Sequence, residues 1–258
     1  MSKPDPTAGL TTGALVALAT RQWRDYRARE PGTCFADPGF TLDLQQAYEL
    51  QGAVSALRVA DGDRVIGYKV GCTGARTVAQ FGMTGPIRGY LYESEARRNG
   101  GRLSAAGFAQ LAIEGEMALR IGEDGGIAAA FPVIELHNFV FRAQRKTLSE
   151  LVANNGLNAG IVLPDDPWLS TPLFLTQDAT LSVRINGCLY GSSGLWPLPN
   201  GPAASLEWMQ RNLACSGLRL EPGDIVLAGT PLGLYPVAAG DHVAVCLNDT
   251  VTTQCVVC

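Results

Sequence analysis

The stretch that decides the fold is residues 114–136, EGEMALRIGEDGGIAAAFPVIEL. It contains two apolar runs of strand length, Glu114–Ile121 and Ala128–Leu136, separated by a glycine-containing turn. Further runs of this kind cover residues 64–70, 160–163, 179–185, 225–227, 242–247 and 251–257. Asn186-Gly187 follows one of these runs and is typical of a two-residue β-hairpin turn. From residue 63 onward the chain is therefore predicted to be mainly β.

The first sixty residues have a helical pattern instead. Apolar residues between Leu15 and Tyr26 recur at the spacing of one helix face, and Glu30-Pro31-Gly32 ends that helix. A second helix is predicted from Thr41, as its N-cap residue, to Asp61-Gly62. The N-terminal part is therefore predicted to be helical.

Two more helices are predicted inside the β-rich part, over residues 148–155 and over Pro202–Cys215. Helices grouped at one end of a chain and followed by many strands indicate an α+β fold rather than a doubly wound sheet. We place a boundary between an N-terminal helical segment, residues 1–62, and a β-rich domain, residues 63–258. The length of 258 residues suits such an arrangement.

The charge content excludes one class of partner. Lys and Arg number 20 against 24 Asp and Glu, so the net charge is −4 and no basic footprint for nucleic acid is present. Charged residues make up 17% of the chain, which is below the usual quarter. Either a large core or a surface buried in a homo-oligomer accounts for this low content.

The chain shows no targeting or membrane signal. Its first residues lack the apolar segment of a secretory signal, and no apolar run approaches the roughly 18 residues of a membrane span. The seven cysteines are scattered, and the single CxxC pair, Cys255 and Cys258, is weak evidence for zinc or redox chemistry. We therefore predict a cytoplasmic protein with no membrane partner.

Glutamates interrupt the apolar stretch 114–136. In a strand, Glu114 and Glu116 project from the same face, about 7 Å apart. An edge strand with one polar face explains this pair as well as a metal site does. Glu135, at the end of the adjacent apolar run, favours the metal site. An all-oxygen set of three carboxylates predicts Mg²⁺ or Mn²⁺ rather than zinc.

His137 and Lys69 are further candidates. Alternation places His137 on the face of Glu135, where it is a metal ligand, a neighbour of one, or a packing residue, as a lone histidine more often is. Lys69 lies in an apolar run bracketed by glycines, either pointing to solvent or half-buried beside an anionic site. Next to a divalent cation its pKa would fall, which makes proton transfer feasible near neutral pH.

An ordered set of motifs extends from residue 67 toward the C-terminus. It comprises Gly67-Tyr68-Lys69-Val70-Gly71, Glu114-x-Glu116, Glu135, Val152-Ala153-Asn154-Asn155, Asn200-Gly201-Pro202, Leu220–Thr230 and Pro236–Asp241. The set resembles the 2-keto-4-pentenoate hydratase and 4-oxalocrotonate decarboxylase group of the fumarylacetoacetate hydrolase superfamily. Each motif is weak alone, but their order and approximate spacing agree from about Leu15 to the end of the chain.

The resemblance implies a twisted, barrel-like mixed β domain next to a small helical part. It implies Mg²⁺ or Mn²⁺ bound by Glu114, Glu116 and Glu135, with Lys69 acting at the enol or carboxylate end of the substrate. A 2-oxo or 2-hydroxy-dienoate acid would chelate the metal through its carboxylate and C2 oxygen. The ion would then act as a Lewis acid that stabilises the enolate common to hydration and decarboxylation.

Three substrate-binding residues are also predicted: Arg88, Asn155 and Thr230. Thr230 would hydrogen-bond the substrate carboxylate, or serve its own turn. Arg88 would supply a cation for a second carboxylate, or lie in solvent at the rim. It belongs to Gly85-Pro86-Ile87-Arg88-Gly89, which replaces an acid-containing Gln-Pro-Asp-Phe-Gly-like loop of the family. Asn155 lies where family members commonly have Ala-Asp-Asn-Ala-Ser and this chain has Ala-Asn-Asn-Gly-Leu.

The leading functional hypothesis is a metal-dependent lyase, a hydratase of a small 2-hydroxy-dienoate or 2-oxo acid. The missing loop acid argues against hydration without excluding it, so a decarboxylase of the 4-oxalocrotonate type stays open. A non-catalytic protein that binds a small acid is a further alternative. Hydrolysis of an acylpyruvate ranks lowest, because the superfamily's hydrolases use a Glu-His pair and no histidine precedes His137.

Overall fold

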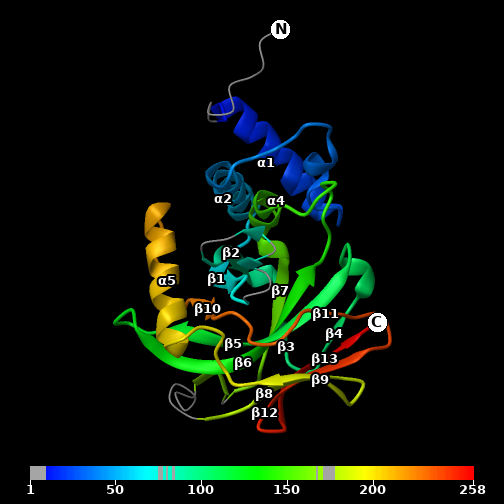
Figure 1. The fold of residues 1–258 in the computed structure, drawn as a ribbon, viewed down its shortest axis with the longest axis vertical. Coiled ribbons are helices and arrows are strands. Elements are labelled where there is room, and N and C mark those ends of the chain that lie inside the picture. The colour runs from blue at the N-terminus through cyan, green and yellow to red at the C-terminus, as the bar shows by residue number, and fades with distance from the viewer. Residues whose placement is uncertain (1–9, 75–77, 80, 83–84, 167, 171–177) are drawn as a thin grey trace.

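The computed structural model describes residues 10–74, 78–79, 81–82, 85–166, 168–170 and 178–258. Helices α1 (Thr12–Arg27), α2 (Leu44–Ala60) and α4 (Leu148–Ala153) lie together at one end of the molecule, and α5 (Gly201–Cys215) stands beside the sheets (Figure 1). The strands form a curled, half-barrel arrangement below them (Figure 1). This architecture confirms the α+β, barrel-like expectation. No helix in these ranges is long and apolar enough to cross a membrane.

The strands form two sheets. The larger sheet has the order β2-β1-β10-β5-β6-β7-β3, with β11 paired to β5, and the smaller one has the order β4-β13-β12-β8-β9. The strand bounds are β1 Val65–Gly71, β2 Ile87–Tyr92, β3 Ala96–Arg98, β4 Gly101–Leu103, β5 Leu111–Ile121, β6 Ile127–Asn138, β7 Asn158–Leu163, β8 Leu181–Ile185, β9 Cys188–Ser193, β10 Ile225–Leu227, β11 Tyr235–Pro236, β12 His242–Leu247 and β13 Thr250–Val257. Single 3₁₀ turns cover Thr33–Ala36, Glu93–Glu95, Ala105–Gly107, Asn155–Leu157 and Trp168–Ser170.

Strand β5 separates the apolar core from the face that carries the glutamates. Ile113 and Met117 of β5 belong to the core cluster that includes residues of β8 and β12 in the smaller sheet. At Gly115 the two sheets are so close that a Cβ atom would lie 2.5 Å from the Val183 side chain. Side chains alternate along a strand. Glu114 and Glu116 therefore project to the other side, away from the smaller sheet.

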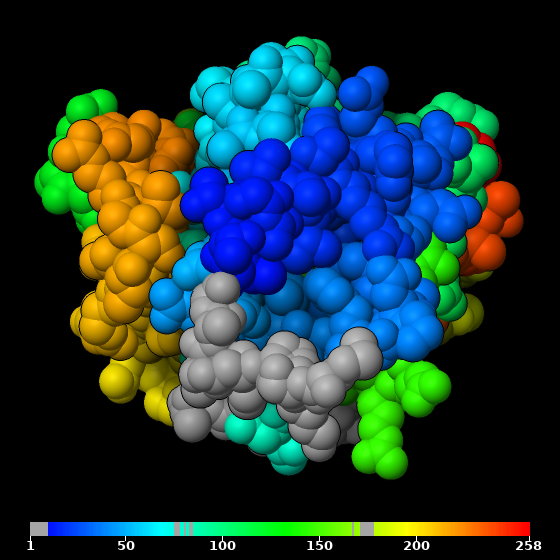
Figure 2. Space-filling model, turned by 90° about the horizontal axis from the view of Figure 1, so that it is seen from above, coloured from blue at the N-terminus to red at the C-terminus, as the bar shows by residue number. Residues whose placement is uncertain are grey.

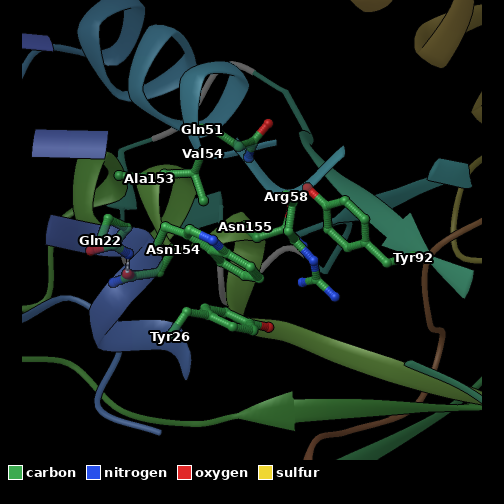
Figure 3. Close-up of a pocket in the computed structure, with 10 residues that line it drawn as sticks. Gln22, Tyr26, Gln51, Val54, Arg58, Tyr92, Ala153, Asn154 and Asn155 are labelled. Carbon is green, nitrogen blue, oxygen red and sulfur yellow. Dashed lines mark hydrogen bonds between the residues drawn. The ribbon is translucent and has the colours of Figure 1, made fainter. Parts of the chain in front are cut away.

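The helical layer is tied to the larger sheet by buried polar contacts. Tyr26 of α1 donates a hydrogen bond to the Asn158 carbonyl of β7 at 2.8 Å, and the Gln51 amide of α2 donates to the Arg88 carbonyl of β2 at 3.0 Å. The same amide donates to the Val152 carbonyl of α4 at 2.7 Å. The Arg58 guanidinium of α2 lies 3.6 Å from the centre of the Tyr92 ring of β2 (Figure 3). Helix α4 thus belongs to this layer although it follows residue 62, and the domain boundary at residue 62 stays a prediction.

Most predicted elements are confirmed, with one correction at the start of α2. The hairpin turn between β8 and β9 has positive φ at Asn186 and Gly187, as a type I′ turn requires. The N-cap of α2, however, is Asp43 and not Thr41. Its carboxylate accepts from the Gln46 backbone N–H at 2.8 Å, and the Gln46 side chain accepts from the Asp43 N–H at 3.0 Å. This reciprocal pair is a capping box, in which Gln46 supplies the second half.

Strand β2 is the main element that the sequence pattern does not predict. All six of its residues are buried, so the sequence lacks the polar–apolar alternation of a half-buried strand. It pairs with β1 in antiparallel register, with Gly89 opposite Lys69. The position of β2 therefore decides what surrounds Lys69.

Replacing Gly67 by alanine is expected to destabilise the fold strongly. Gly67 has φ +145°, and a Cβ atom there would lie 1.9 Å from the Ile225 carbonyl oxygen of β10. Because backbone must move, we expect a loss of about 3 kcal/mol in the free energy of unfolding, measured by urea denaturation. Gly52→Ala, inside α2 with its nearest contact at 3.8 Å, is the control and should stabilise by about 0.5–1 kcal/mol. Equal urea midpoints for the two variants would contradict this account.

Candidate active site

The larger sheet brings four predicted site residues together. Glu114 of β5 is directly opposite Glu135 of β6 in the antiparallel register, so their side chains share one face. His137 follows Glu135 by two residues and lies on the same face. Lys69 comes from β1, which is separated from β6 by β10 and β5. Only the curl of the sheet brings its ammonium group to the glutamates.

Glu135 is at the centre of the contacts. Its carboxylate lies 3.1 Å from the Lys69 Nζ atom and 3.4 Å from His137 Nε2. It also accepts a hydrogen bond from the Asn158 amide at 2.7 Å. The Glu114 carboxylate lies 3.4 Å from the same His137 nitrogen. Glu135, Lys69 and His137 are buried, whereas the Glu114 side chain is 20% exposed, so the site is reached from the side of Glu114.

The donor atoms of this site fit a divalent cation. One ligand atom each from Glu114, Glu135 and His137 lies within 4.8 Å of the others. The Nδ1 atom of His137 and both carboxylate oxygens of Glu116 are buried without a hydrogen-bond partner among the described residues, and His137 Nε2 has only the long contacts to the two carboxylates there. Such unpaired buried groups are costly, and coordination of a cation would satisfy them. Glu116 itself does not belong to the group of three closest ligand atoms.

Burial and crowding shift the pKa values of these groups in opposite directions. Burial raises the pKa of Glu116 well above its usual value, and the negative charges of Glu135 and Glu114 raise it further. Burial also acts to raise the pKa of Glu135, but Lys69 and His137 outweigh it and lower this pKa. Burial acts to lower the pKa of His137, but the carboxylates of Glu135 and Glu114 together outweigh it and raise this pKa to about 9. One carboxylate is thus kept ionised while its neighbour favours the protonated form.

The pKa of Lys69 is raised among these side chains. Burial acts to lower it, but the carboxylates of Glu135 and Glu114 have the larger combined effect. This direction is opposite to the one expected from the sequence, since that expectation assumed a divalent cation beside the ammonium. The lowered pKa therefore stays a prediction for the metal-bound site.

A cavity of about 430 Å³ opens at these residues. Lys69, Glu114 and His137 form its polar end, and Phe139 and Phe141 form part of an apolar wall. The volume suits a small organic acid. The cavity shown in Figure 3, between α1, α2 and α4, is about 20 Å³, which is room for about one water molecule. The cavity of about 430 Å³ is the candidate substrate site, because Lys69, Glu114 and His137 line it.

Thr230 lines this cavity, but its hydroxyl group is engaged. It donates to the Gly115 carbonyl at 2.8 Å and accepts from the Leu232 N–H at 3.0 Å. A hydroxyl has one proton to donate, and a carboxylate only accepts. The role of Thr230 in binding a substrate carboxylate stays a prediction that requires its hydroxyl to leave Gly115.

Asn155 serves the backbone of β2. Its side-chain oxygen accepts from the Tyr90 N–H at 2.6 Å, and its amide donates to the Tyr90 carbonyl at 2.9 Å. It lines the small cavity of Figure 3 and not the one beside Lys69. Both ends of the amide hold β2 in place, so a role of Asn155 in substrate binding stays a prediction that requires its amide to leave Tyr90.

Arg88 does not line the cavity beside Lys69, and its role in substrate binding stays a prediction. A Cβ atom on Gly89 would lie 3.1 Å from the Lys69 side chain, so this position of β2 faces the candidate substrate site. By alternation Arg88 points to the opposite face. There its side chain lines a separate groove between α2 and the end of α5.

Several site residues are not predicted from the sequence. Asn158 holds Glu135, and its signal is a polar residue at the start of an apolar run. Gly156 has φ +61°, and a Cβ atom there would lie 2.6 Å from Lys69 Cε. Phe139 and Phe141 follow β6 directly, where nothing in a single sequence distinguishes wall residues from core residues.

Residues 89–258 match the family described as fumarylacetoacetate (FAA) hydrolase C-terminal. The chain belongs to this family. The expected resemblance is thereby confirmed, and Glu114, Glu135 and His137, which could hold a metal ion, all lie within the matched part.

Sequence relatives of the chain include proteins named as hydratases and proteins named as decarboxylases. The chain is 29% identical to a 2-keto-4-pentenoate hydratase of Paraburkholderia phymatum, over 78% of this chain and 82% of that protein. It is 24% identical to a 4-oxalocrotonate decarboxylase of a Pseudomonas species, over 80% and 85%. The solved 4-oxalocrotonate decarboxylase of Pseudomonas putida G7, complexed with magnesium and adipate, superposes with a TM-score of 0.85 at 20% identity, covering 98% of this chain and 100% of that one. The chain therefore shares the fold of that protein over nearly its full length.

Proposed function

We propose that this chain is a divalent-metal-dependent lyase acting on a small 2-oxo or 2-hydroxy-dienoate acid, with hydration as the leading reaction. The observation that carries the proposal is the group of Glu114, Glu135 and His137 beside Lys69, at the polar end of a cavity of about 430 Å³. Relatives named as hydratases and decarboxylases of such acids support it. Both reactions belong to the lyases.

The proposed cofactor is Mg²⁺ or Mn²⁺, with Glu114, Glu116 and Glu135 as ligands. Carboxylates suit both ions, whereas an imidazole ligand from His137 would favour Mn²⁺. When bound, the ion supplies a Lewis acid for the carboxylate and C2 oxygen of the substrate. The Asn158 amide, which donates to Glu135, would fix the orientation of that ligand.

Lys69 is proposed to act at the enol or carboxylate end of the substrate. Its buried ammonium is held 3.1 Å from Glu135 in a niche kept open by Gly89 and Gly156. As an ammonium it donates hydrogen bonds to an oxygen that gains negative charge, and it can deliver a proton there. Phe139 and Phe141 would exclude water from the apolar part of the substrate.

Decarboxylation is the second candidate, and the side chain of Ile87 favours it. Ile87 stands where the family's loop carries an acid, and a Cβ atom on Gly156 would lie 3.3 Å from it. The neighbourhood of Lys69 thus has an apolar side chain in place of a carboxylate that takes part in hydration. Release of carbon dioxide from a 2-oxo dicarboxylic acid, measured beside loss of dienoate absorbance, separates the two reactions. Ligand-induced thermal stabilisation without any turnover would support the non-catalytic alternative instead.

We propose that the protein forms a homo-oligomer and that it is located in the cytoplasm. Leu189 and Tyr190 are more than half exposed on β9, the edge strand of the smaller sheet, where another copy would bury them. The seven cysteines are all free, which suits a reducing compartment. Sedimentation velocity measures the oligomeric state and so tests the proposed homo-oligomer.

Addition of Mn²⁺ to chelator-treated protein is expected to raise the thermal midpoint. Glu114, Glu116 and Glu135 repel one another, and a bound cation relieves this repulsion. At a free Mn²⁺ concentration of one hundred times the dissociation constant, the free energy of unfolding should rise by about 2.7 kcal/mol. Scanning calorimetry resolves the corresponding rise of the thermal midpoint. Ca²⁺ and Mg²⁺ should act in the same direction. An unchanged midpoint for all three ions would rule out the metal site.

A further inference from the structure

A groove of about 820 Å³ lies between α2, β2 and the C-terminal end of α5. Helix α5 stands at the edge of the molecule beside the helical layer (Figures 1 and 2). Arg88 of β2 lines this groove, together with Tyr48 of α2 and Asn212 and Ser216 at the end of α5. The groove is separate from the candidate substrate site, because Arg88 and Gly89 point to opposite faces of β2.

The Arg88 guanidinium is buried but poorly partnered. The residue is 1% exposed, and its Nε atom has no hydrogen-bond partner in the part of the chain that the structure describes. Among the described residues, both terminal nitrogens reach only the Ser216 hydroxyl, at 3.4 Å, the outer limit of a hydrogen bond. No carboxylate among these residues forms an ion pair with it. A buried charge without an opposite charge is costly, so such groups are normally paired.

The surroundings hold Arg88 in place without neutralising it. Its backbone N–H donates to the Tyr48 hydroxyl at 3.2 Å, and its carbonyl accepts from Gln51 at 3.0 Å. The guanidinium carbon lies 5.1 Å from the Tyr48 ring centre and 5.5 Å from that of Tyr90. These cation–π contacts and the negative end of the α5 dipole offset part of the charge. Among the described residues, the N–H donors of the guanidinium still lack an anionic acceptor.

We propose that this groove binds a small monocarboxylate anion on Arg88. A carboxylate matches the planar fork of a guanidinium with two parallel hydrogen bonds. The Ser216 hydroxyl and the Asn212 amide line the groove and can donate further hydrogen bonds. The exposed carboxylate of Glu49 also lines the groove, which disfavours a dianion such as phosphate. One positive charge and one acid nearby therefore select a singly charged ligand.

The test uses acetate as the probe and full-length protein kept free of metal with a chelator. Thermal midpoints are compared in sodium acetate and in sodium chloride at equal ionic strength. We expect acetate to raise the midpoint of the unaltered protein more than chloride does. In Arg88→Met this difference should vanish, while Lys69→Met, altered at the other site, should keep it. Persistence of the acetate effect in Arg88→Met, or its absence from the unaltered protein, would overturn the proposal.

Arg88→Lys covers the case in which Arg88→Met does not fold. It keeps the positive charge but loses the fork, so acetate affinity by titration calorimetry should fall about tenfold. Equal affinity would overturn the proposal. A crystal soaked in bromoacetate should show the bromine signal beside Arg88. If a carboxylate of a second copy of the chain occupies the groove instead, the groove is an assembly contact and the small-ligand proposal fails.

Discussion

Glutamine in place of Glu135 is expected to abolish divalent-cation binding and turnover together. Glu135 contacts Lys69 at 3.1 Å, His137 at 3.4 Å and Asn158 at 2.7 Å, so it connects the groups of the site. Glutamine keeps the shape of the side chain but removes its negative charge. Because that charge would hold the cation that acts as Lewis acid, we expect turnover of a 2-hydroxy-dienoate to fall about 1000-fold or more. Mn²⁺ binding, followed by electron paramagnetic resonance, should be lost in parallel.

The matched control for this variant is Glu207→Gln. Glu207 lies on α5 with its side chain 66% exposed, and its ion pair with Arg211 is on the surface. The same change of one charge there should leave Mn²⁺ binding and turnover within about twofold, since exposed pairs contribute little. A Glu135→Gln protein that binds Mn²⁺ as tightly as this control would remove Glu135 from the ligand set. Glu135→Asp should recover part of the Mn²⁺ affinity.

Replacing Lys69 by methionine is expected to separate cation binding from turnover. The Lys69 ammonium is a positive charge 3.1 Å from a proposed ligand, so its removal makes the site more negative and Mn²⁺ should bind as well or more tightly. Turnover should nevertheless fall by about 10²–10⁴-fold, because a positioned proton donor and hydrogen-bond donor is missing. The two measurements are Mn²⁺ titration and dienoate consumption at saturating Mn²⁺.

The outcome for Lys69→Met distinguishes two roles. If Lys69 only keeps the carboxylates apart, saturating Mn²⁺ should restore turnover in the variant. Persistent loss at saturating Mn²⁺ assigns Lys69 to the chemistry. Lys69→Arg keeps the positive charge, but the arginine side chain is bulkier. Gly156 leaves little room for it, because even a Cβ atom on Gly156 would lie 2.6 Å from Lys69 Cε. We therefore expect Lys69→Arg to recover little turnover.

Local patterns predicted the parts of the site that depend on one strand or one pair of strands. Alternation along β5 places Glu114 and Glu116 on one face, and the strand pair β5–β6 sets Glu135 opposite Glu114. His137 follows from the same rule. These relations need only the period of a strand and the adjacency of two runs.

The positions of Arg88 and Asn155 could not be predicted in this way. Strand β2 is buried on both faces, so its sequence does not indicate which side chain faces which cavity. The close approach of Gly89 to Lys69 settles the direction and sends Arg88 to the opposite groove. Asn155 hydrogen-bonds the backbone of Tyr90 in β2, which is 65 residues away in the sequence. Local sequence patterns do not indicate this contact.

The sequence by itself determined the α+β class, the helical N-terminal part and the row of glutamates, because the periods of helices and strands are local properties. The tertiary structure alone decided that Lys69 meets Glu135, since β1 and β6 are not neighbours in the sheet and only its curl joins them. It also decided that Arg88 is a buried cation away from the site. Contacts between distant strands depend on how whole sheets twist and pack, and no short stretch of sequence contains that information.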